Sequence, residues 1–396
     1  MQAEDCDVLV VGGGPAGLIA AREAARAAPR SSIILLERDD AVGTPVRCGE
    51  GVGSAGLAEF LDSGRVQPSL PWISRRITRV VFRAPDGSEV RVAEGDVGYI
   101  LDRSAFEPVL ATDAIDAGAE IRTGAEAIAM RRDGHRWRVT VNAREVRSEI
   151  TARVVIAADG VESAVGRWAG IDTRVRARDM ESCAQYVVDD VSIDPDAIVL
   201  HFGERVAPGG YAWVFPKGER TANVGLGVLG LRAGGRSAIA WLDDYMRAHF
   251  PNAPAARRTI GGVIVSATVP RTFADGVMLC GDAAHMINPL SGGGIVNAMK
   301  SGRLAAQAAV DALARGDVSA SALASYHAAW MRLLGEDHVR FYRVKEALAR
   351  FDDAFYDGLA RTVNRIPERR RTLRRIFGEA LVRHPTLLPV VAKYFV

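Results

Sequence analysis

The chain has 396 residues, about half of them hydrophobic and a quarter charged, which is ordinary for a globular protein with room for two domains. The formal net charge of +2 argues against nucleic acid as the main partner, because binding a phosphate backbone needs a strong basic surplus. The four cysteines, at positions 6, 48, 183 and 280, stand far apart, so no metal site is predicted. No apolar run reaches the roughly 18 residues that a membrane-spanning helix needs.

The N-terminal segment predicts a nucleotide-binding unit. Residues 6–11, CDVLVV, form a short buried strand, residues 18–28 form an alanine-rich helix, and residues 33–37, IILLE, form a second buried strand. This order over about 30 residues predicts a right-handed βαβ unit with parallel strands. Because the unit begins at once, with no signal peptide before it, we expect a cytoplasmic protein.

The middle of the chain predicts antiparallel sheet inserted into this unit. Two alternating runs flank residues 85–87, PDG, which is a hairpin signal, and a second meander leads into a buried strand at residues 154–158. A helix is predicted between them, near residues 103–118, and strand signals dominate residues 172–275. These insertions separate the nucleotide-binding segments along the chain.

The last third of the chain predicts mostly helix. A long helix follows three glycines at residues 292–294, and the chain is mainly helical beyond residue 318. The sequence therefore predicts an α/β fold, with a Rossmann-like domain, an inserted antiparallel-sheet domain and a helical C-terminal region. The predicted domains are residues 1–75, 98–171 and 274–315 for the Rossmann-like domain, residues 76–97 and 172–273 for the inserted domain, and residues 316–396 for the helical region.

The stretch GGGPAG forms a dinucleotide-binding motif between the first strand and the first helix. Gly12 allows a tight turn, Gly14 lets the backbone approach a pyrophosphate, and Gly17 lets the helix pack closely on the strand. The phosphates then lie at the positive end of the helix. Glu37 follows Gly17 by 20 residues, at the end of the second strand, where a carboxylate can accept ribose hydroxyls.

Two later segments favour FAD over NAD. VVIAADGVES carries Asp159 and Gly160 at the end of a buried strand, and GVMLCGDAAHMINPLSGGGIVNAM carries Asp282 ahead of the glycines at residues 292–294. In this order the segments resemble the FAD-binding fold of the aromatic-hydroxylase type, within the glutathione-reductase-like group. The resemblance implies that Asp282 accepts a hydrogen bond from the ribityl chain and that Arg103 contacts FAD through its planar guanidinium.

A more specific resemblance rests on two further stretches. In the geranylgeranyl reductase family the first reads P-x-x-C-G-E-G or close to it, with the Cys-Gly beside the flavin, and residues 45–51 match it. The second reads P-x-x-Y-x-W-x-F-P followed by G-x-G, and residues 208–227 match it completely. The chain resembles this family over roughly residues 5–310, and most strongly the archaeal type that saturates the prenyl chains of ether lipids.

The resemblance implies an FAD-dependent reductase that saturates isolated double bonds of geranylgeranyl chains, with ether phospholipid precursors as the first choice. The Rossmann-like domain then binds FAD and the inserted domain binds substrate. The residues expected at the FAD are Gly12, Gly14, Ala16, Gly17, Glu37, Arg38, Cys48, Gly49, Gly51, Arg103, Ala127, Asp159, Gly160, Asp282, Gly293, Gly294 and Ile295.

Tyr211, Trp213 and Phe215 occupy alternate positions, so they share one face of a strand. A polyprenyl chain offers only CH, methyl and π contacts, which a wall of aromatic side chains suits. We therefore expect these three residues to bind substrate and to face the isoalloxazine. The alternative is plain core between a sheet and a helix.

The predicted reaction needs both a proton and a hydride. An isolated alkene has no neighbouring carbonyl to stabilise negative charge, so we expect a proton to add to one carbon while the flavin supplies hydride to the other. Cys48 is the candidate catalytic residue, as proton donor, or else a small residue that packs against the flavin ring. Glu50 is interpreted either as an acid or as the cap of a loop.

Several alternatives stay open. An FAD-dependent aromatic or polyketide monooxygenase shares the FAD segments, and a non-catalytic prenyl-lipid carrier is similar in fold. The expected partners are a polyprenyl lipid and an electron donor, either NAD(P)H or a ferredoxin; the oligomeric state is open. After ether phospholipid, the open prenyl substrates are a (bacterio)chlorophyll ester, free geranylgeranyl diphosphate and quinone tails.

The C-terminal segment suggests contact with a membrane surface. An arginine cluster at residues 369–375 precedes an apolar end. Such a segment predicts either a basic amphipathic helix on the inner face of the membrane or a helix that packs on the body of the protein. The first interpretation suits a lipid substrate and makes the protein peripheral.

Overall fold

The computed structural model describes residues 4–61, 64, 66, 67, 69–371 and 378. By their contacts these residues form two compact units. Unit 1 lies within Met1–Val46, Arg103–Arg174 and Ser266–Val339, and unit 2 lies within Arg47–Asp102, Val175–Val265 and Arg340–Val396. Both units contain sheet and helix, in agreement with the predicted α/β fold.

Unit 1 is built on a sheet whose central strands are parallel. Its strands are β1 (Glu4–Val11), β2 (Ile33–Leu36), β6 (Glu120–Arg122), β7 (Ala125–Asp133), β8 (Arg136–Ala143), β9 (Val146–Ala157), β15 (Phe273–Ala274) and β16 (Val277–Leu279). The order β16-β9-β1-β2-β6 is parallel throughout, with β15 antiparallel at the edge. β7, β8 and β9 form the predicted antiparallel meander.

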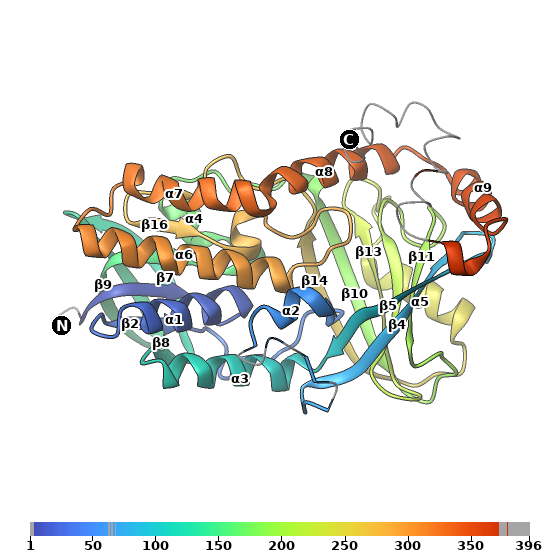
Figure 1. Ribbon diagram of the computed structural model, residues 1–396, viewed down its shortest axis with the longest axis horizontal. Helices are drawn as coiled ribbons and strands as arrows, with labels where there is room; N and C mark the ends of the chain where they lie inside the picture. Colours follow the sequence, from blue (N-terminus) through green and yellow to red (C-terminus); the bar gives the residue numbers. More distant parts are fainter. Residues whose placement is uncertain (1–3, 62–63, 65, 68, 372–377, 379–396) are drawn as a thin grey trace. The chain divides into compact units, whose positions relative to one another are not determined.

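The helices of unit 1 come from several parts of the chain, some of them directly after β1, β9 and β16. They include α1 (Pro15–Ala27), α3 (Arg103–Asp116), the short η1 (Gly160–Glu162), α4 (Ala164–Trp168), η3 (Gly281–Ala284) and α6 (Ile295–Arg315). α1 lies between α3 and α6 (Figure 1). Its approach to α6 is close, since a Cβ built on Gly302 would lie 2.1 Å from the carbonyl oxygen of Ala16.

Unit 2 is built on a largely antiparallel sheet. Its strands are β3 (Gly51–Gly53), β4 (Ile73–Arg83), β5 (Glu89–Leu101), β10 (Met180–Val188), β11 (Ala197–Phe202), β12 (Tyr211–Pro216), β13 (Ala222–Leu229) and β14 (Ala255–Ile264). Their order is β14-β10-β13-β12-β11-β4-β5-β3, and β4 and β11 form a parallel pair within it. The short α2 (Ser54–Ala58) and η2 (Ala177–Asp179) precede β4 and β10.

One helix covers a face of this sheet where the sequence predicted mainly strands. α5 (Ala238–His249) begins after Ser237, whose hydroxyl accepts the amide N–H of Ala240. Its buried Leu242, Tyr245 and Met246 recur at helical spacing and pack on β10 and β13. The strand prediction for residues 172–275 was therefore wrong over this helix, because its apolar period is three to four residues and not two.

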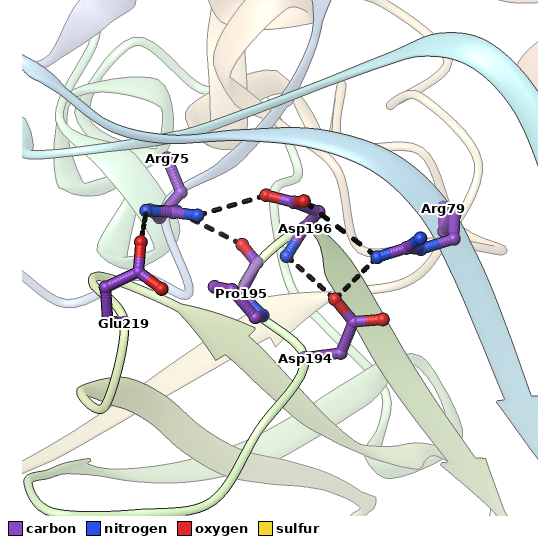
Figure 2. A network of polar contacts seen from close by, with 6 residues as sticks. All are labelled: Arg75, Arg79, Asp194, Pro195, Asp196 and Glu219. Atoms are coloured by element: carbon purple, nitrogen blue, oxygen red, sulfur yellow. Dashed lines mark hydrogen bonds and ion pairs between the residues drawn. The ribbon is translucent and has the colours of Figure 1, made fainter.

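The parallel pair of β4 and β11 is reinforced by ion pairs at its edge (Figure 2). Arg75 on β4 binds Asp196 at 3.0 Å and Glu219 at 2.6 Å. Arg79 binds Asp194 at 2.7 Å, and the Asp196 carbonyl accepts the amides of Thr78 and Arg79. Exposed pairs of this kind contribute at most about 1 kcal/mol each, so the network adds little to stability.

The described C-terminal region is helical, as predicted. It contains α7 (Ala320–Trp330), the π-helical turn η4 (Met331–Gly335), α8 (Glu336–Leu348), α9 (Asp353–Val363) and η5 (Glu368–Arg370). Residues 372–375 of the predicted arginine cluster lie outside the described residues, as does the apolar end after it, apart from Gly378. No helix in the described part of the chain has the length and apolar character to cross a membrane.

The two units do not coincide with the predicted domains: residues 172–174, 266–273 and 316–339 belong to unit 1, and the described residues from 340 onward belong to unit 2. Residues 47–75 and 98–102 belong to unit 2 by contacts, although the sequence assigned them to the FAD domain. The reason is local: β3 pairs with β5, and the Leu101 amide donates to the Glu50 carbonyl at 2.9 Å. The predicted domain boundaries were drawn by expected FAD and substrate binding and not by contacts, so they stay a prediction.

Candidate functional site

Three glycines, two in the turn from β1 to α1 and one in the first turn of α1, differ in the space around them. A Cβ on Gly12, whose φ is +108°, would lie 2.2 Å from the Ala158 oxygen, and a Cβ on Gly17 would lie 1.9 Å from the Gly12 oxygen. Protein packing thus excludes a side chain at both. A Cβ on Gly14 meets no described atom within 4 Å. Gly14 is the N-cap of α1, so the first amides of the helix face this open side.

Glu37 lies just after β2, and its hydrogen bonds join the turn between β1 and α1 to the loop that follows β2. One carboxylate oxygen accepts the Gly13 amide at 2.6 Å, and the other accepts the Asp39 amide at 2.8 Å. A carboxylate has about four lone-pair positions, so Glu37 retains acceptor capacity for a ribose hydroxyl. Arg38 points elsewhere and binds Glu162, next to Gly160 in η1, at 2.7 Å.

Asp159 follows β9 and has an acceptor that the described protein leaves unused. Its Oδ2 accepts the Val165 amide at 2.9 Å, while its buried Oδ1 has no hydrogen-bond partner among the described residues. Burial raises the pKa of this carboxyl. A buried acceptor without a partner is costly, so this atom suits a hydroxyl or N–H of a ligand.

Asp282 lies in η3, beside the start of α6. A Cβ on Gly294, the N-cap of α6, would lie 3.5 Å from Asp282 Oδ1, so the carboxylate and the helix start are neighbours. Loss of water contact raises the pKa of Asp282 to about 6, and the positive charge of Arg103 opposes the rise. Gly293 precedes this cap and Ile295 is the first residue of α6. The arrangement presents a carboxylate and free helix amides together.

The structure brings most of the predicted unit 1 residues to one edge of the sheet. A Cβ on Gly12 would meet Ala158 and the Asp159 amide nitrogen, and a Cβ on Gly281 would meet Ala16, so these turns lie close together. Arg103 begins α3 and is held by Glu107, with an Nε to Oε1 distance of 2.7 Å. Ala127 lies on β7, at a shift in the register with β8. The cradle of Gly14, the acceptor on Asp159 and the helix start at Gly294 fit the pyrophosphate and polar chain of FAD.

Unit 2 carries the predicted aromatic strand. Tyr211, Trp213 and Phe215 are half-buried on one face of β12, with ring centroids 6.0 and 6.2 Å apart along the strand. Ala212 and Val214 point the other way, into the core under α5. The shared face is therefore confirmed, and these aromatic residues lie on the sheet face opposite the α5 core. We call Tyr211, Trp213 and Phe215 the aromatic face.

Glycines give the aromatic face room on the neighbouring strand. On β13, Gly227 pairs with Tyr211 and Gly225 pairs with Trp213. A Cβ on Gly225 would lie 2.4 Å from Trp213 Cζ2, so the indole lies over this glycine. The G-x-G of the sequence thus lets side chains of β12 and β10 lie over the backbone of β13.

The segment with Cys48 is held against the aromatic face. A Cβ on Gly49 would lie 3.0 Å from the Phe215 ring, and one on Gly51 would lie 3.3 Å from it. Gln185 on β10 donates to the Cys48 carbonyl at 3.0 Å and accepts the Trp213 indole N–H at 2.9 Å. One amide side chain therefore joins the Cys48 segment to the aromatic face.

Glu50 is part of this support. Its carboxylate is buried, with 1% of the residue exposed, and accepts Lys217 Nζ at 2.7 Å and the Asn223 amide at 2.8 Å. Its backbone N–H donates to Cys48 Sγ at 3.2 Å. These contacts favour the loop-cap interpretation of Glu50 over an acid.

The chain matches known families across both units. Residues 7–221 match the family described as FAD dependent oxidoreductase, and residues 179–264 match the geranylgeranyl reductase catalytic domain. A digeranylgeranylglycerophospholipid reductase of Methanosphaerula palustris is 41% identical over 96% of both chains. This chain belongs to the geranylgeranyl reductase family. The reductase of the same name from Methanocella arvoryzae is 39% identical, over 96% of this chain and 97% of its own.

Solved structures agree on the fold of this reductase family member. A geranylgeranyl bacteriochlorophyll reductase-like protein from Thermoplasma acidophilum is 32% identical, with a TM-score of 0.91 over 99% of this chain and all of its own. The flavin-dependent halogenase CmlS shares the fold at 18% identity, with a TM-score of 0.71 over 97% of this chain and 71% of its own. The predicted α/β fold is confirmed, and the chain is an FAD-dependent oxidoreductase.

Sequence reasoning missed the residues that support the aromatic face. Gln185, Asn223 and Lys217 were not singled out, although each binds the Cys48 segment or Glu50. One signal was present: Glu181, Cys183 and Gln185 alternate along a strand and put three non-aliphatic side chains on one face. Their partners depend on the pairing of β10 with β13, which the sequence alone does not give.

Proposed function

We propose that this flavoenzyme saturates isolated double bonds of geranylgeranyl chains on ether phospholipid precursors. The observation that carries the proposal is the aromatic face, which lies away from the α5 core and beside Gly225 and Gly227 of β13. Such a surface offers CH–π and apolar contacts and suits a long branched hydrocarbon. The named relatives act on digeranylgeranylglycerophospholipid, which supports this choice of head group.

The proposed roles of the unit 1 residues follow from their groups. Gly14 and the start of α1 would hold the pyrophosphate, Glu37 the ribose, and Asp282 with the start of α6 the part of FAD nearest its ring. When bound and reduced, the flavin supplies a hydride. Arg103, Arg38 and Ala127 stay proposed cofactor contacts on the resemblance alone.

In unit 2, Tyr211, Trp213 and Phe215 are the proposed substrate contacts. The Cys48, Gly49 and Gly51 segment is the proposed flavin-facing loop, with Cys48 as a candidate for the chemistry. Replacing Cys48 by Ala is expected to leave FAD bound and to slow alkene reduction. Turnover at the wild-type rate with bound flavin would exclude a catalytic part for this thiol.

The experiment that tests the function uses purified enzyme with its flavin reduced by dithionite in the absence of oxygen. With digeranylgeranylglycerophospholipid, mass spectrometry should find products that gain two hydrogens for each double bond saturated. A yellow enzyme that leaves the lipid unchanged would contradict the proposal. An oxygen-containing product formed only in air would indicate a monooxygenase instead.

Substitutions on the two sides of the unit 2 sheet test whether substrate binds at the aromatic face. Trp213→Leu is expected to raise KM for the prenyl lipid with unchanged flavin content, because it removes the largest ring of the aromatic face. Trp241→Leu is the matched control, since Trp241 lies on α5, on the other side of the sheet. Equal effects of the two substitutions on KM would argue against the aromatic face as substrate site.

The electron donor and the location are part of the same proposal. Either NAD(P)H or a reduced ferredoxin would reduce the flavin, and stopped-flow bleaching of the flavin by each donor distinguishes them. A lipid substrate favours an enzyme that works in the cytoplasm at the inner membrane face. Co-sedimentation with anionic vesicles, lost on removal of residues 372–396, tests the membrane contact.

A further inference from the structure

Glu181 is a buried carboxylic acid beside the aromatic face. It lies on β10 and points to the same side of the sheet as Cys183 and Gln185, while Ala184 points into the α5 core. A Cβ built on Gly227 would lie 2.7 Å from Glu181 Oε2 and 3.2 Å from Cys183 Sγ. The carboxyl group therefore lies over the second glycine of the G-x-G, as the Trp213 indole lies over the first.

The neighbours of this carboxyl are mostly uncharged. Gly227 pairs with Cys183 on one side and with Tyr211 on the other, so a thiol and a phenol flank Glu181. Only 9% of Glu181 is exposed. Burial raises the pKa of Glu181 to about 7, and the positive charge of Lys345 opposes the rise. Near neutral pH the group thus carries a proton in a substantial part of the molecules.

Lys345 does not neutralise Glu181, because it is bound elsewhere. Its Nζ lies 3.3 Å from Asp179 Oδ1 and donates to the Val265 carbonyl at 3.1 Å and to the Arg178 carbonyl at 3.2 Å. Asp179 also accepts the Tyr342 hydroxyl at 2.8 Å. The charges of Lys345 on α8 and Asp179 on η2 are therefore paired with each other.

Three other acids of unit 2 are less suited to give up a proton. Burial raises the pKa of Cys183 and that of Tyr211 far above neutrality, so both hold their protons firmly. Glu50 is engaged by Lys217 and Asn223. Cys48, whose Sγ accepts the Glu50 amide N–H, stays the rival proton donor. Glu181 combines a proton near neutral pH with a place beside the aromatic face.

On the basis of the proposed function, we propose that Glu181 is the catalytic acid that protonates the prenyl double bond. The Glu181 O–H bond breaks and its proton forms a C–H bond with one alkene carbon. The other carbon receives the hydride that the reduced flavin supplies, so the π bond is replaced by two C–H bonds. The lipid is reduced, the flavin is oxidised, and Glu181 is left as a carboxylate that regains its proton from water.

Glu181→Gln tests the assignment, because the amide keeps the size of the side chain and removes the acid. We expect dithionite-reduced E181Q to lose about a hundredfold or more in kcat, the usual range for a lost general acid. Flavin content and KM should change little, and Glu181→Asp should restore part of the rate. Glu219→Gln, a change at an exposed carboxylate of the same unit, is the matched control.

Two further measurements separate an acid from a structural residue. The wild-type kcat should fall as pH rises through about 7, and E181Q should lack this step. The other titratable side chains near Glu181 and the aromatic face are Cys48, Cys183, Tyr211, Asp179 and Lys345, so the infrared band of the protonated carboxyl is followed as well. That band should titrate near pH 7 in wild type and be missing from E181Q, whether or not lipid is present.

The outcomes distinguish the two proposals. A wild type that reduces no prenyl lipid would overturn the proposed function and this inference with it. An active wild type with an equally active E181Q would overturn the inference alone, as would a larger loss of kcat in Cys48→Ala than in E181Q. If E181Q fails to fold, the activity of E181D and the infrared titration of wild type test the role of Glu181. Full activity of E181D, together with no carboxyl of wild type titrating near pH 7, would contradict the inference.

Discussion

Trp213 donates its indole N–H to Gln185 at 2.9 Å, across the backbone of Gly225 on the strand between them. The hydrogen bond spans three neighbouring strands and is possible only because the middle residue has no side chain. The same Gln185 then donates to the Cys48 carbonyl at 3.0 Å. The G-x-G motif and the Cys-Gly segment, although far apart in the sequence, are thus parts of one arrangement in unit 2.

Gly225→Ala tests the close approach at this crossing. The new Cβ would lie 2.4 Å from Trp213 Cζ2 and 2.7 Å from the Ala184 carbonyl oxygen, and the second contact cannot be relieved by a side-chain rotation. We expect a loss of about 1–3 kcal/mol in the free energy of unfolding, measured with denaturant, and a displaced indole.

Gly218→Ala is the control for that substitution. Its Cβ would meet Thr221 at 3.8 Å, an ordinary contact, so the same change of residue should be nearly neutral there. Equal effects of the two substitutions on the unfolding free energy would show that backbone freedom, and not the indole contact, requires Gly225.

Gln185→Leu tests the polar link. The substitution leaves the Trp213 indole N–H and the Cys48 carbonyl without their partner, and each loss is worth about 1–3 kcal/mol when the group stays buried. We expect a higher KM for prenyl lipid with unchanged flavin content. Adding Trp213→Phe removes one orphaned donor, so the double variant should be more stable than Gln185→Leu alone. A double variant that is less stable would contradict the link.

The FAD half of the fold was predictable because its motifs are local. Gly12, Gly14 and Gly17 lie within one turn, and Asp159 and Asp282 each follow a strand that is recognisable as a buried apolar run. Parallel strands bring such turns to one edge of a sheet, so their proximity follows from the βαβ topology. The shared face of Tyr211, Trp213 and Phe215 followed from the two-residue period of a strand.

The rest of the site was not predictable because it depends on register between strands. Gln185 meets Trp213 only because β10 and β12 both pair with β13 at Gly225. A shift of one residue would turn Gln185 and Glu181 into the α5 core. The helix α5 was missed for a different reason, since its apolar positions lie among strong strand signals.

Lys217→Met tests the buried ion pair under the Cys48 segment. Lys217 Nζ lies 2.7 Å from Glu50 Oε2 and also donates to the Leu101 carbonyl at 2.8 Å. Loss of one partner of a buried pair typically costs about 3–5 kcal/mol, so we expect a marked loss of stability in denaturant titrations. The double variant Glu50→Gln with Lys217→Met should recover part of it. A double variant with additive losses would show that the two residues act independently.

Gly14→Ala and Gly17→Ala separate cofactor binding from folding. A Cβ on Gly14 meets no described atom within 4 Å, so the apoprotein should keep its unfolding free energy while flavin content falls. A Cβ on Gly17 would lie 1.9 Å from the Gly12 oxygen, so that variant should be destabilised before any cofactor binds. Flavin absorbance of the purified variants and denaturation of the apoproteins measure the two effects. Full flavin content in Gly14→Ala would contradict the proposed pyrophosphate contact.

Asp282→Asn tests the carboxylate beside the start of α6 through the pH dependence of stability. The pKa of Asp282 is raised to about 6 in the folded protein, against roughly 4 in an unfolded chain. Between these values the folded state binds the proton more tightly, so the stability of the apoprotein should fall as pH rises from about 4 to about 6. Above about pH 6 Asp282 is ionised in both states, so its contribution to the free energy of unfolding no longer changes with pH.

The amide that this substitution introduces cannot ionise, so the variant should lack the fall in stability. It should match wild type near pH 4 and be more stable above about pH 6, while its flavin content falls because the proposed acceptor is lost. Denaturant titrations of both apoproteins across this range measure the difference in unfolding free energy. Parallel stability curves for the two proteins would contradict the raised pKa of Asp282, because a carboxyl with the same pKa in both states contributes no pH dependence.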